Sequence, residues 1–401
     1  MRILALIADR PTPPIGGARV RNYYLWPALQ ALGVEVQVLG YDVSPGPASA
    51  PASGPPGVPG EFFTRERQSL PARAWNAARH SYHVWPRSQA LAARVDALAA
   101  AWRPEVIHAE ELRMGFYLPR SRSQAFRAAQ TLTLHNVESG LHRRLGSAPI
   151  SAAAALINRL HQRSLETYER RMISLVDRAF AFSPADLERY RALYPRANWA
   201  LTRNGAQARP LRPPPQVAAA KLLFVGSLSW TPNVRGLFWL LDQVLPRLAP
   251  GVALTVAGSG AGPELRRRLA AAGAVLLDTP ADLTPVYAAH ALCIAPLFEG
   301  SGTRGKILEA CAYERLVVTT SLGLEGLDLR PGIEGVVLAD NAESFAGELR
   351  RWLADTESRA RLAQAGRQAV LARYDWSVVA AELLQHWREL VRLKQAARHL
   401  L

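Results

Sequence analysis

The chain has 401 residues, of which 49% are hydrophobic and ten are Trp, so it can fill two cores and is too long for one ordinary domain. No apolar run reaches the length of about 18 residues that a membrane-spanning helix needs. The only cysteines, Cys293 and Cys311, lack ligand-like neighbours, which disfavours a disulfide framework or a thiolate metal site and fits a reducing cytoplasm.

The net charge of +15 is concentrated in the first half. Residues 1–208 carry 26 basic and 15 acidic side chains, whereas the remainder carries 22 and 18. Such an excess attracts an anionic partner, which can be a membrane surface, a phosphorylated acceptor or nucleic acid. A soluble surface with a positive bias explains the same counts.

The first half alternates strands and helices. The apolar run Arg2–Ala8 predicts a buried strand rather than a signal peptide, because Asp9 interrupts it. A turn-rich loop and a helix to Leu32 follow, and Val34–Leu39 is the next strand, which makes a βαβ unit with parallel strands. Further strands are expected at Val106–Ala109, Ala129–Leu134 and Ala179–Ser183.

Two stretches of the first half break this rhythm. Ser44–Gly60 contains ten Pro or Gly in seventeen residues, which predicts a mobile surface loop. Arg65–Trp102 mixes arginine with aromatic residues, as interfacial membrane segments do. A helical excursion whose aromatic side chains pack on the core would have the same composition.

A proline-rich segment divides the chain, because Arg209–Pro215 cannot continue a helix or a central strand. We therefore predict an N-terminal domain over residues 1–208, a linker over 209–217, a C-terminal domain over 218–376 and a final amphipathic helix over 377–401. In the second domain, strands are expected at Leu222–Val225, Leu254–Ala257, Val275–Leu277, Leu292–Pro296, Leu316–Thr320 and Val336–Ala339, and helices at Asn233–Leu248, Gly262–Ala272 and Thr303–Tyr313.

Two such doubly wound α/β domains place a cleft between the carboxyl ends of their sheets, where ligands of open α/β sheets bind. In the first domain, Gly16 and Gly17 open the first helix, so backbone amides can approach a phosphate there, and Arg19 and Arg21 add charge nearby. The pattern is not G-x-G-x-x-G, which leaves a nicotinamide site unsupported. Two glycines also fit an ordinary turn.

The strongest motif lies between Ala295 and Ala310. A strand ends at Pro296, a glycine-rich turn follows, and Arg304 and Lys306 lie where the next helix begins. Free amides and two cations at one helix start suit a diphosphate. Glu309 lies further along this helix, where it can accept hydrogen bonds from a ribose diol or be an ordinary solvated glutamate.

This segment resembles the donor-binding motif of the retaining GT-B glycosyltransferases of family 4, also called group 1. Six other segments resemble that family in the expected order: Gly16-Gly17, Thr131–Asn136, Phe182–Asp186, Arg203–Gly205, Leu223–Leu228 and Ser321–Leu327. The resemblance covers nearly the whole chain and depends on the order of the motifs.

The resemblance implies two Rossmann-like domains facing across a cleft, with the C-terminal helix crossing back to the first domain. It also implies transfer of a hexose from a nucleotide-diphosphate sugar to an acceptor hydroxyl with retention of configuration, in cell-surface polysaccharide or glycolipid synthesis. The catalytic candidates are then His135, Arg304 and Lys306. The donor-binding candidates are Gly16, Gly17, Asn204, Gly226, Glu299, Ser301, Gly302, Thr303 and Glu309.

The chain departs from the family pattern at two places. Nine residues lie between Glu299 and Glu309, where the family has seven between its two glutamates, so either Glu299 or Ser301 takes the first role. The usual Arg and Lys after the second-domain glycine are absent after Gly226, so neutralisation of the diphosphate falls to Arg304 and Lys306. Because these cations can replace a metal ion, we expect no metal and no cofactor.

His135 ends a strand, where a histidine is either a structural hydrogen-bonding group or, as the resemblance implies, a contact to the donor sugar. His108, Glu110 and Glu111 end another strand of the same sheet. They either meet the acceptor or are solvated loop residues.

Two other classes of protein fit part of the sequence. A sugar-nucleotide epimerase of the same fold shares the diphosphate site, but the order of motifs favours a transferase. A nucleic-acid-binding protein would explain the charge, but the basic residues are dispersed and no zinc spacing or RNP-like strand occurs, so no nucleic-acid partner is expected. The expected partners are a nucleotide-diphosphate sugar and an acceptor, which is a sugar, a lipid-linked molecule or another small molecule. An anionic membrane surface is a further expected partner, because the chain is expected to be cytoplasmic and peripheral on the inner face of the membrane.

Overall fold

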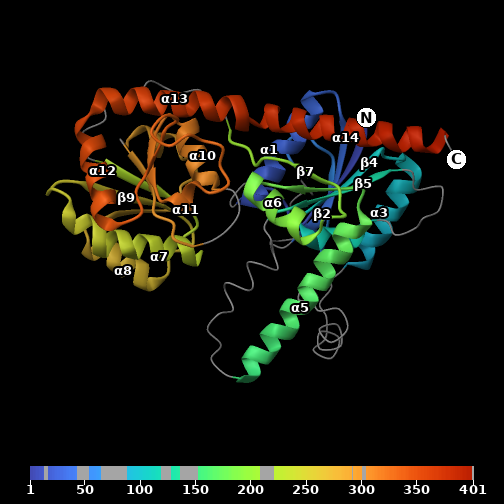
Figure 1. Cartoon of the computed structure of the whole chain (residues 1–401), viewed down its shortest axis with the longest axis horizontal. Helices are drawn as coiled ribbons and strands as arrows, with labels where there is room; N and C mark the ends of the chain where they lie inside the picture. Colours follow the sequence, from blue (N-terminus) through green and yellow to red (C-terminus); the bar gives the residue numbers. More distant parts are fainter. Residues whose placement is uncertain are drawn as a thin grey trace. The chain divides into compact units, whose positions relative to one another are not determined.

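A computed structural model describes residues 1–12, 17–42, 54–64, 88–118, 128–135, 152–207, 221–290, 292–299 and 304–399. The chain forms two compact units. Unit 1 contains residues 1–203 and 379–401, and unit 2 contains residues 204–378 (Figure 1). The expected linker, residues 209–217, lies outside the described residues.

Unit 1 is built on a seven-stranded sheet with the order β3-β2-β1-β4-β5-β6-β7, in which every neighbouring pair is parallel. Its central strands are buried because they are nearly continuous apolar runs with helices on the faces of the sheet. The strands are β1 (Arg2–Ile7), β2 (Glu35–Asp42), β3 (Gly60–Thr64), β4 (Val106–Glu110), β5 (Ala129–Leu134), β6 (Arg178–Ala181) and β7 (Trp199–Leu201). The helices are α1 (Gly17–Ala31), α3 (Gln89–Trp102), the short 3₁₀ helix η1 (Leu112–Tyr117), α5 (Ala152–Leu175) and α6 (Pro184–Leu193).

Neither edge strand of this sheet, β3 or β7, was predicted from the sequence. Residues 54–60 were expected in a loop, but Val58 is buried and the Pro59 carbonyl accepts a hydrogen bond of 2.9 Å from the Val38 amide, so this segment leads into β3. Residues 44–53 lie outside the described residues. β7 has three residues, too few for an alternating pattern to be recognised.

In the basic and aromatic stretch, only the last part is described. There α3 buries Leu91, Val95 and Leu98 in the core of unit 1, so the interpretation as a helical excursion is confirmed for this part. Residues 65–87 lie outside the described residues. Within the described parts of the chain, no helix is both long enough and apolar enough to cross a membrane.

Unit 2 is built on a six-stranded parallel sheet with the order β10-β9-β8-β11-β12-β13. Two doubly wound α/β units are thus confirmed. The strands are β8 (Lys221–Val225), β9 (Ala253–Gly258), β10 (Val275–Asp278), β11 (Leu292–Ala295), β12 (Leu316–Thr319) and β13 (Val336–Leu338). The helices are α7 (Thr231–Trp239), α8 (Pro263–Ala271), α9 (Thr284–Ala288), α10 (Gly305–Ala312), α11 (Ser321–Leu324), α12 (Ala342–Ala354) and α13 (Thr356–Tyr374).

Two expectations about the helices of unit 2 were wrong in detail. The helix expected over 233–248 begins at Thr231 and continues after α7 as the π-type turn η2 (Leu240–Val244) and the 3₁₀ turn η3 (Leu245–Arg247), where Pro246 cannot supply an amide. The helix expected from Thr303 begins at Gly305. The helices α9, α11, α12 and α13 were not predicted. The cysteines Cys293 and Cys311 are buried free thiols.

The last helix, α14 (Trp376–His399), belongs to unit 1 from Val379 onward, which confirms that it crosses back. Its Trp387 is fully buried. Its Glu389 and Lys394 form ion pairs of 2.7 Å with Arg178 and Asp177, respectively, at the start of β6.

Candidate active site

In unit 2, side chains from the sequence motifs meet at the carboxyl ends of the parallel strands. Gly226 directly follows β8, Asn233 lies in the first turn of α7, and Lys306 lies in the first turn of α10. Ligands of open α/β sheets bind at this edge. We call Lys306, Asn233, Phe224 and Gly226 the lysine cluster.

The lysine cluster holds one ammonium group without a carboxylate. Lys306 Nζ donates to Asn233 Oδ1 over 2.5 Å and lies 4.3 Å from the centre of the Phe224 ring. No acidic side chain among the described residues forms an ion pair with it. Removal from water, and secondarily the charge of Arg304, lower the pKa of Lys306 to about 7. An anionic ligand would supply the missing counter-charge.

Close packing favours glycine at Gly226 and requires it at Gly258. A Cβ there would lie 2.9 Å from Asn233 Nδ2 and 3.0 Å from Lys306 Nζ, and a Cβ at Gly258, the last residue of β9, would lie 1.9 Å from the Gly226 carbonyl oxygen. The two glycines therefore let β8 and β9 end side by side, with the Gly226 backbone against the Lys306 ammonium group.

Glu309, one turn after Lys306 on α10, is half-buried and is anchored by a tyrosine. The Tyr287 hydroxyl donates to Glu309 Oε2 over 3.2 Å, and the Tyr287 ring stacks on Tyr313 with centres 4.3 Å apart. Burial, and then the nearby Glu309 charge, raise the pKa of Tyr287 well above its usual value. The tyrosine therefore stays protonated and keeps donating.

The remaining predicted site residues of the segment 295–310 lie at the N-cap of α10 or precede it in the chain. Arg304 is buried at the N-cap of α10, where its carbonyl accepts a hydrogen bond of 2.9 Å from the Ile307 amide. Glu299 is partly exposed and forms an ion pair of 3.0 Å with Arg235 of α7. Ser301, Gly302 and Thr303 lie outside the described residues.

In unit 1, the charges near the first glycine loop are paired within the protein. Gly17 begins α1, and Gly16 lies outside the described residues. Arg19 forms an ion pair of 2.6 Å with Asp9. Arg21 was expected to add charge near a phosphate, but it is fully buried in an ion pair of 3.0 Å with Glu110, so this expectation was wrong.

The predicted histidine meets a buried group of polar side chains at the ends of β4 and β5. Nε2 of His135 lies 2.9 Å from Glu110 Oε2, and Nε2 of His108 lies 3.3 Å from Glu110 Oε1. We call Glu110, Arg21, His108 and His135 the carboxylate network. Glu110 and His108 of this network are completely buried. Both had been expected to meet the acceptor or to be solvated loop residues, and this expectation was wrong for both.

Burial sets the charges in the carboxylate network. Burial lowers the pKa of His108 and so favours its neutral form. Burial alone would raise the pKa of Glu110, but the Arg21 guanidinium and the hydrogen bonds from the two histidines hold it well below its usual range. Glu110 is therefore ionised at neutral pH. This role was not predicted from the sequence, because a His-x-Glu pattern on a strand does not reveal its partner on α1.

Asn204 is buried, and its side-chain Oδ1 accepts a hydrogen bond of 3.1 Å from the Gly205 amide. Gly205 packs so tightly against Trp376 that a Cβ would lie 2.4 Å from the indole ring. These two residues therefore have a structural role in unit 2, beside any contact to a donor.

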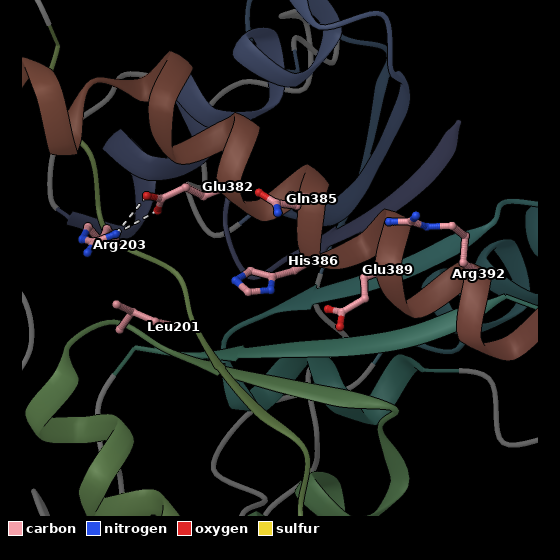
Figure 2. Close-up of a pocket in the computed structure, with 7 residues that line it drawn as sticks. All are labelled: Leu201, Arg203, Glu382, Gln385, His386, Glu389 and Arg392. Carbon is pink, nitrogen blue, oxygen red and sulfur yellow. Dashed lines mark hydrogen bonds and ion pairs between the residues drawn. The ribbon is translucent and has the colours of Figure 1, made fainter.

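Unit 1 also contains a cavity of about 540 Å³ between the end of β7 and α14 (Figure 2). Figure 2 shows Arg203 paired with Glu382, whose Oε2 lies 3.0 Å from Arg203 Nη1. The cavity contains none of the predicted site residues. Its lining consists of Leu201, Arg203, Glu382, Gln385, His386, Glu389 and Arg392.

Comparison with known families decides the assignment. Residues 16–205 match the model of a glycosyl transferase 4-like domain, and residues 219–355 match that of the glycosyl transferases group 1. The chain belongs to the group 1 glycosyltransferases. The two matches lie in unit 1 and unit 2, respectively, apart from two residues at the first boundary.

Relatives in sequence agree with this family. The glycosyltransferase is 28% identical to a glycogen synthase of Mycobacterium tuberculosis over 412 aligned positions, which cover 96% of this chain and 94% of that protein. A 44.6 kDa protein from the cps region of Klebsiella pneumoniae, of uncharacterised function, is 34% identical, but the match covers 31% of this chain and 35% of that protein.

Solved structures show the same GT-B fold. The sucrose-phosphate synthase of Thermosynechococcus elongatus matches with a TM-score of 0.74 at 19% identity, covering 98% of this chain and 100% of that one. HepE of Anabaena, in complex with UDP-glucose, matches with a TM-score of 0.66 at 16% identity, covering 97% of this chain and 100% of that one. The predicted family and fold are thus confirmed.

The described residues include no group of three or more His, Cys, Asp or Glu side chains that could hold a metal ion. Metal independence stays a prediction.

Proposed function

We propose that this glycosyltransferase transfers a hexose from a uridine-diphosphate sugar to an acceptor hydroxyl, with retention of configuration and without a metal ion. The observation that carries the proposal is the lysine cluster, which holds a cation without a carboxylate at the carboxyl end of β8. The HepE complex with UDP-glucose and the glycogen synthase relative support this class of donor and a role in polysaccharide or glycolipid synthesis.

In this mechanism, the diphosphate gains negative charge as the sugar leaves. Lys306 and Arg304 stabilise that charge, since preorganised cations lower the barrier where charge develops. Glu309, anchored by Tyr287, accepts hydrogen bonds from the ribose hydroxyls. His135 contacts the sugar. Because no side chain is assigned as a nucleophile, the leaving phosphate accepts the proton of the acceptor hydroxyl during a front-face displacement.

The first experiment tests donor binding and the cations. We expect UDP and UDP-glucose to raise the melting temperature, because a ligand at a hundred times its Kd adds about 2.7 kcal/mol to the free energy of unfolding. Lys306→Ala and Arg304→Ala should each lower kcat at least about tenfold, and Glu309→Ala should raise the KM for the donor. The matched control is Lys221→Ala, an exposed lysine at the opposite end of β8, which should keep full activity.

Full activity in both cation variants would refute the assignment of the diphosphate site. Conversion of a sugar nucleotide without any acceptor would favour the rival epimerase activity. The anomeric configuration of the product, read by proton NMR, tests retention, and unchanged activity in EDTA tests metal independence.

The basic first half supports peripheral attachment of this cytoplasmic enzyme to the inner face of an anionic membrane, where lipid-linked acceptors would be reached. Flotation should recover the protein with anionic vesicles and leave it behind with neutral ones. Recovery with neither refutes the attachment.

A further inference from the structure

Glu110 receives hydrogen bonds from three different elements although it is completely buried. Arg21 Nε of α1 donates to Oε1 over 3.0 Å, His108 Nε2 of β4 lies 3.3 Å from the same oxygen, and His135 Nε2 after β5 lies 2.9 Å from Oε2. The ion pair with Arg21 keeps the carboxylate charged. An ionised carboxylate only accepts hydrogen bonds, so the histidine nitrogens facing it carry the protons.

The side of the network away from His135 is fixed by a chain of hydrogen bonds. Trp387 of α14 can only donate, and its Nε1 lies 3.2 Å from Thr131 Oγ1. Thr131 Oγ1 lies 2.7 Å from His108 Nδ1, and His108 Nε2 lies 3.0 Å from Thr133 Oγ1 and 3.3 Å from Glu110 Oε1. The chain therefore holds the carboxylate in one orientation.

The ring of His135 is fixed as well. Its centre lies 4.6 Å from that of the Phe182 ring, and the Arg21 guanidinium lies 4.8 Å from the centre of the same phenyl ring. The His135 side chain is 14% exposed, so only part of it is accessible to a ligand. A ring that carries its single proton on Nε2 presents an unprotonated Nδ1, which accepts hydrogen bonds.

We propose that Glu110 is a positioning residue of this glycosyltransferase, whose carboxylate holds the proton of His135 on Nε2 so that Nδ1 accepts a hydrogen bond from a substrate hydroxyl. The inference rests on the proposed function only in assigning the substrate contact to His135. The tautomer itself follows from the contacts within unit 1.

The first test reads the tautomer in the wild-type protein without any substrate. Nitrogen-15 NMR of the protein with labelled histidine distinguishes protonated from unprotonated ring nitrogens, and a His135→Gln variant identifies the His135 signals among those of the nine histidines. Neutral His135 should show a protonated Nε2 and an unprotonated Nδ1. The opposite tautomer would overturn the proposal, whatever the variants do.

The second test is a double-mutant cycle of Glu110→Gln and His135→Ala. Glu110→Gln alone should lower kcat/KM about tenfold, because the neutral amide no longer offers a charged acceptor to the Nε2 proton of His135. In the His135→Ala background it should cause little further loss, because its effect passes through His135. Losses that multiply in the double variant would show that Glu110 acts independently of His135 and would overturn the proposal.

Two variants control for folding. Glu169→Gln alters another fully buried carboxylate of unit 1, which accepts hydrogen bonds from the hydroxyls of Tyr190 and Tyr194, and it should leave the His135 tautomer unchanged. If Glu110→Gln does not fold, the double variant Arg21→Met/Glu110→Gln takes the place of Glu110→Gln in the cycle. It removes both buried charges together, so neither is left without its partner.

The tests separate the two claims. A wild-type enzyme that transfers no sugar from any nucleotide sugar refutes the proposed function. If the wild-type enzyme is active, the opposite tautomer of His135 refutes only the role of Glu110. Multiplicative losses in the double variant do the same.

Discussion

Lys306 offers a sharp test of the site, because the same group should weaken the fold and strengthen donor binding. Its pKa lies at about 7 rather than at the usual 10.5. One unit corresponds to about 1.4 kcal/mol, so keeping this half-buried ammonium group charged costs the folded state about 5 kcal/mol below pH 7. Lys306→Met removes the charge and keeps a side chain of similar length.

The sign follows from proton binding. Between pH 7 and 10.5 the unfolded chain keeps the Lys306 proton while the folded chain loses it, so the stability of the wild type gains from this group as the pH rises. Methionine binds no proton. The advantage of Lys306→Met in the free energy of unfolding should therefore be largest below pH 7 and shrink by about 1.4 kcal/mol per pH unit above it.

Donor binding should move in the opposite direction. A bound diphosphate supplies a counter-charge and raises the pKa of Lys306, so binding above pH 7 should take up a proton. The Kd of the wild type for UDP should rise by up to about tenfold per pH unit above pH 7. The Lys306→Met variant should bind UDP weakly, and its Kd should lack this dependence on pH.

Urea unfolding of both proteins at pH 6, 7, 8 and 9, followed by tryptophan fluorescence, measures the first effect. Calorimetric titration with UDP in two buffers of different ionisation enthalpy counts the protons. A difference in unfolding free energy that stays constant from pH 6 to 9 would refute the reasoning, because it would show that the pKa of Lys306 is not lowered in the fold.

Three further substitutions test the packing around the site. Arg21→Met leaves the carboxylate of Glu110 buried without its counter-charge and should cost about 3–5 kcal/mol at pH 7; chemical unfolding measures it, and a loss below about 1 kcal/mol would contradict the ion pair. Gly258→Ala places a Cβ 1.9 Å from the Gly226 carbonyl oxygen, so it should destabilise unit 2 by about 1–3 kcal/mol. It should also weaken UDP binding in a thermal-shift assay. An unchanged melting temperature and unchanged UDP binding would show that the ends of β8 and β9 can move apart without cost. Trp387→Phe keeps an aromatic ring but loses the indole donor, which should cost about 1 kcal/mol in urea unfolding, and an unaltered midpoint would show that this hydrogen bond has no net value.

The local pattern of the sequence determined most of the secondary structure and the family. Apolar runs between turns gave the central strands, and Ala129–Leu134 forms β5 with the predicted bounds. The order of short motifs gave the group 1 assignment, and the glycine-rich segment placed Lys306 at the start of a helix. These features are encoded by neighbours in the chain, so periodicity and turn residues reveal them.

Only the tertiary structure decided which polar side chains are paired and buried. Arg21 and Glu110 are 89 residues apart, and Trp387 and Thr131 are 256 residues apart, so no local pattern links them. Glu110 therefore looked like a solvated or acceptor-binding residue in sequence. Its charge is stable in the interior because two parallel strands and the helix α1 bring donors to one point, and a sequence does not show where separate segments will meet.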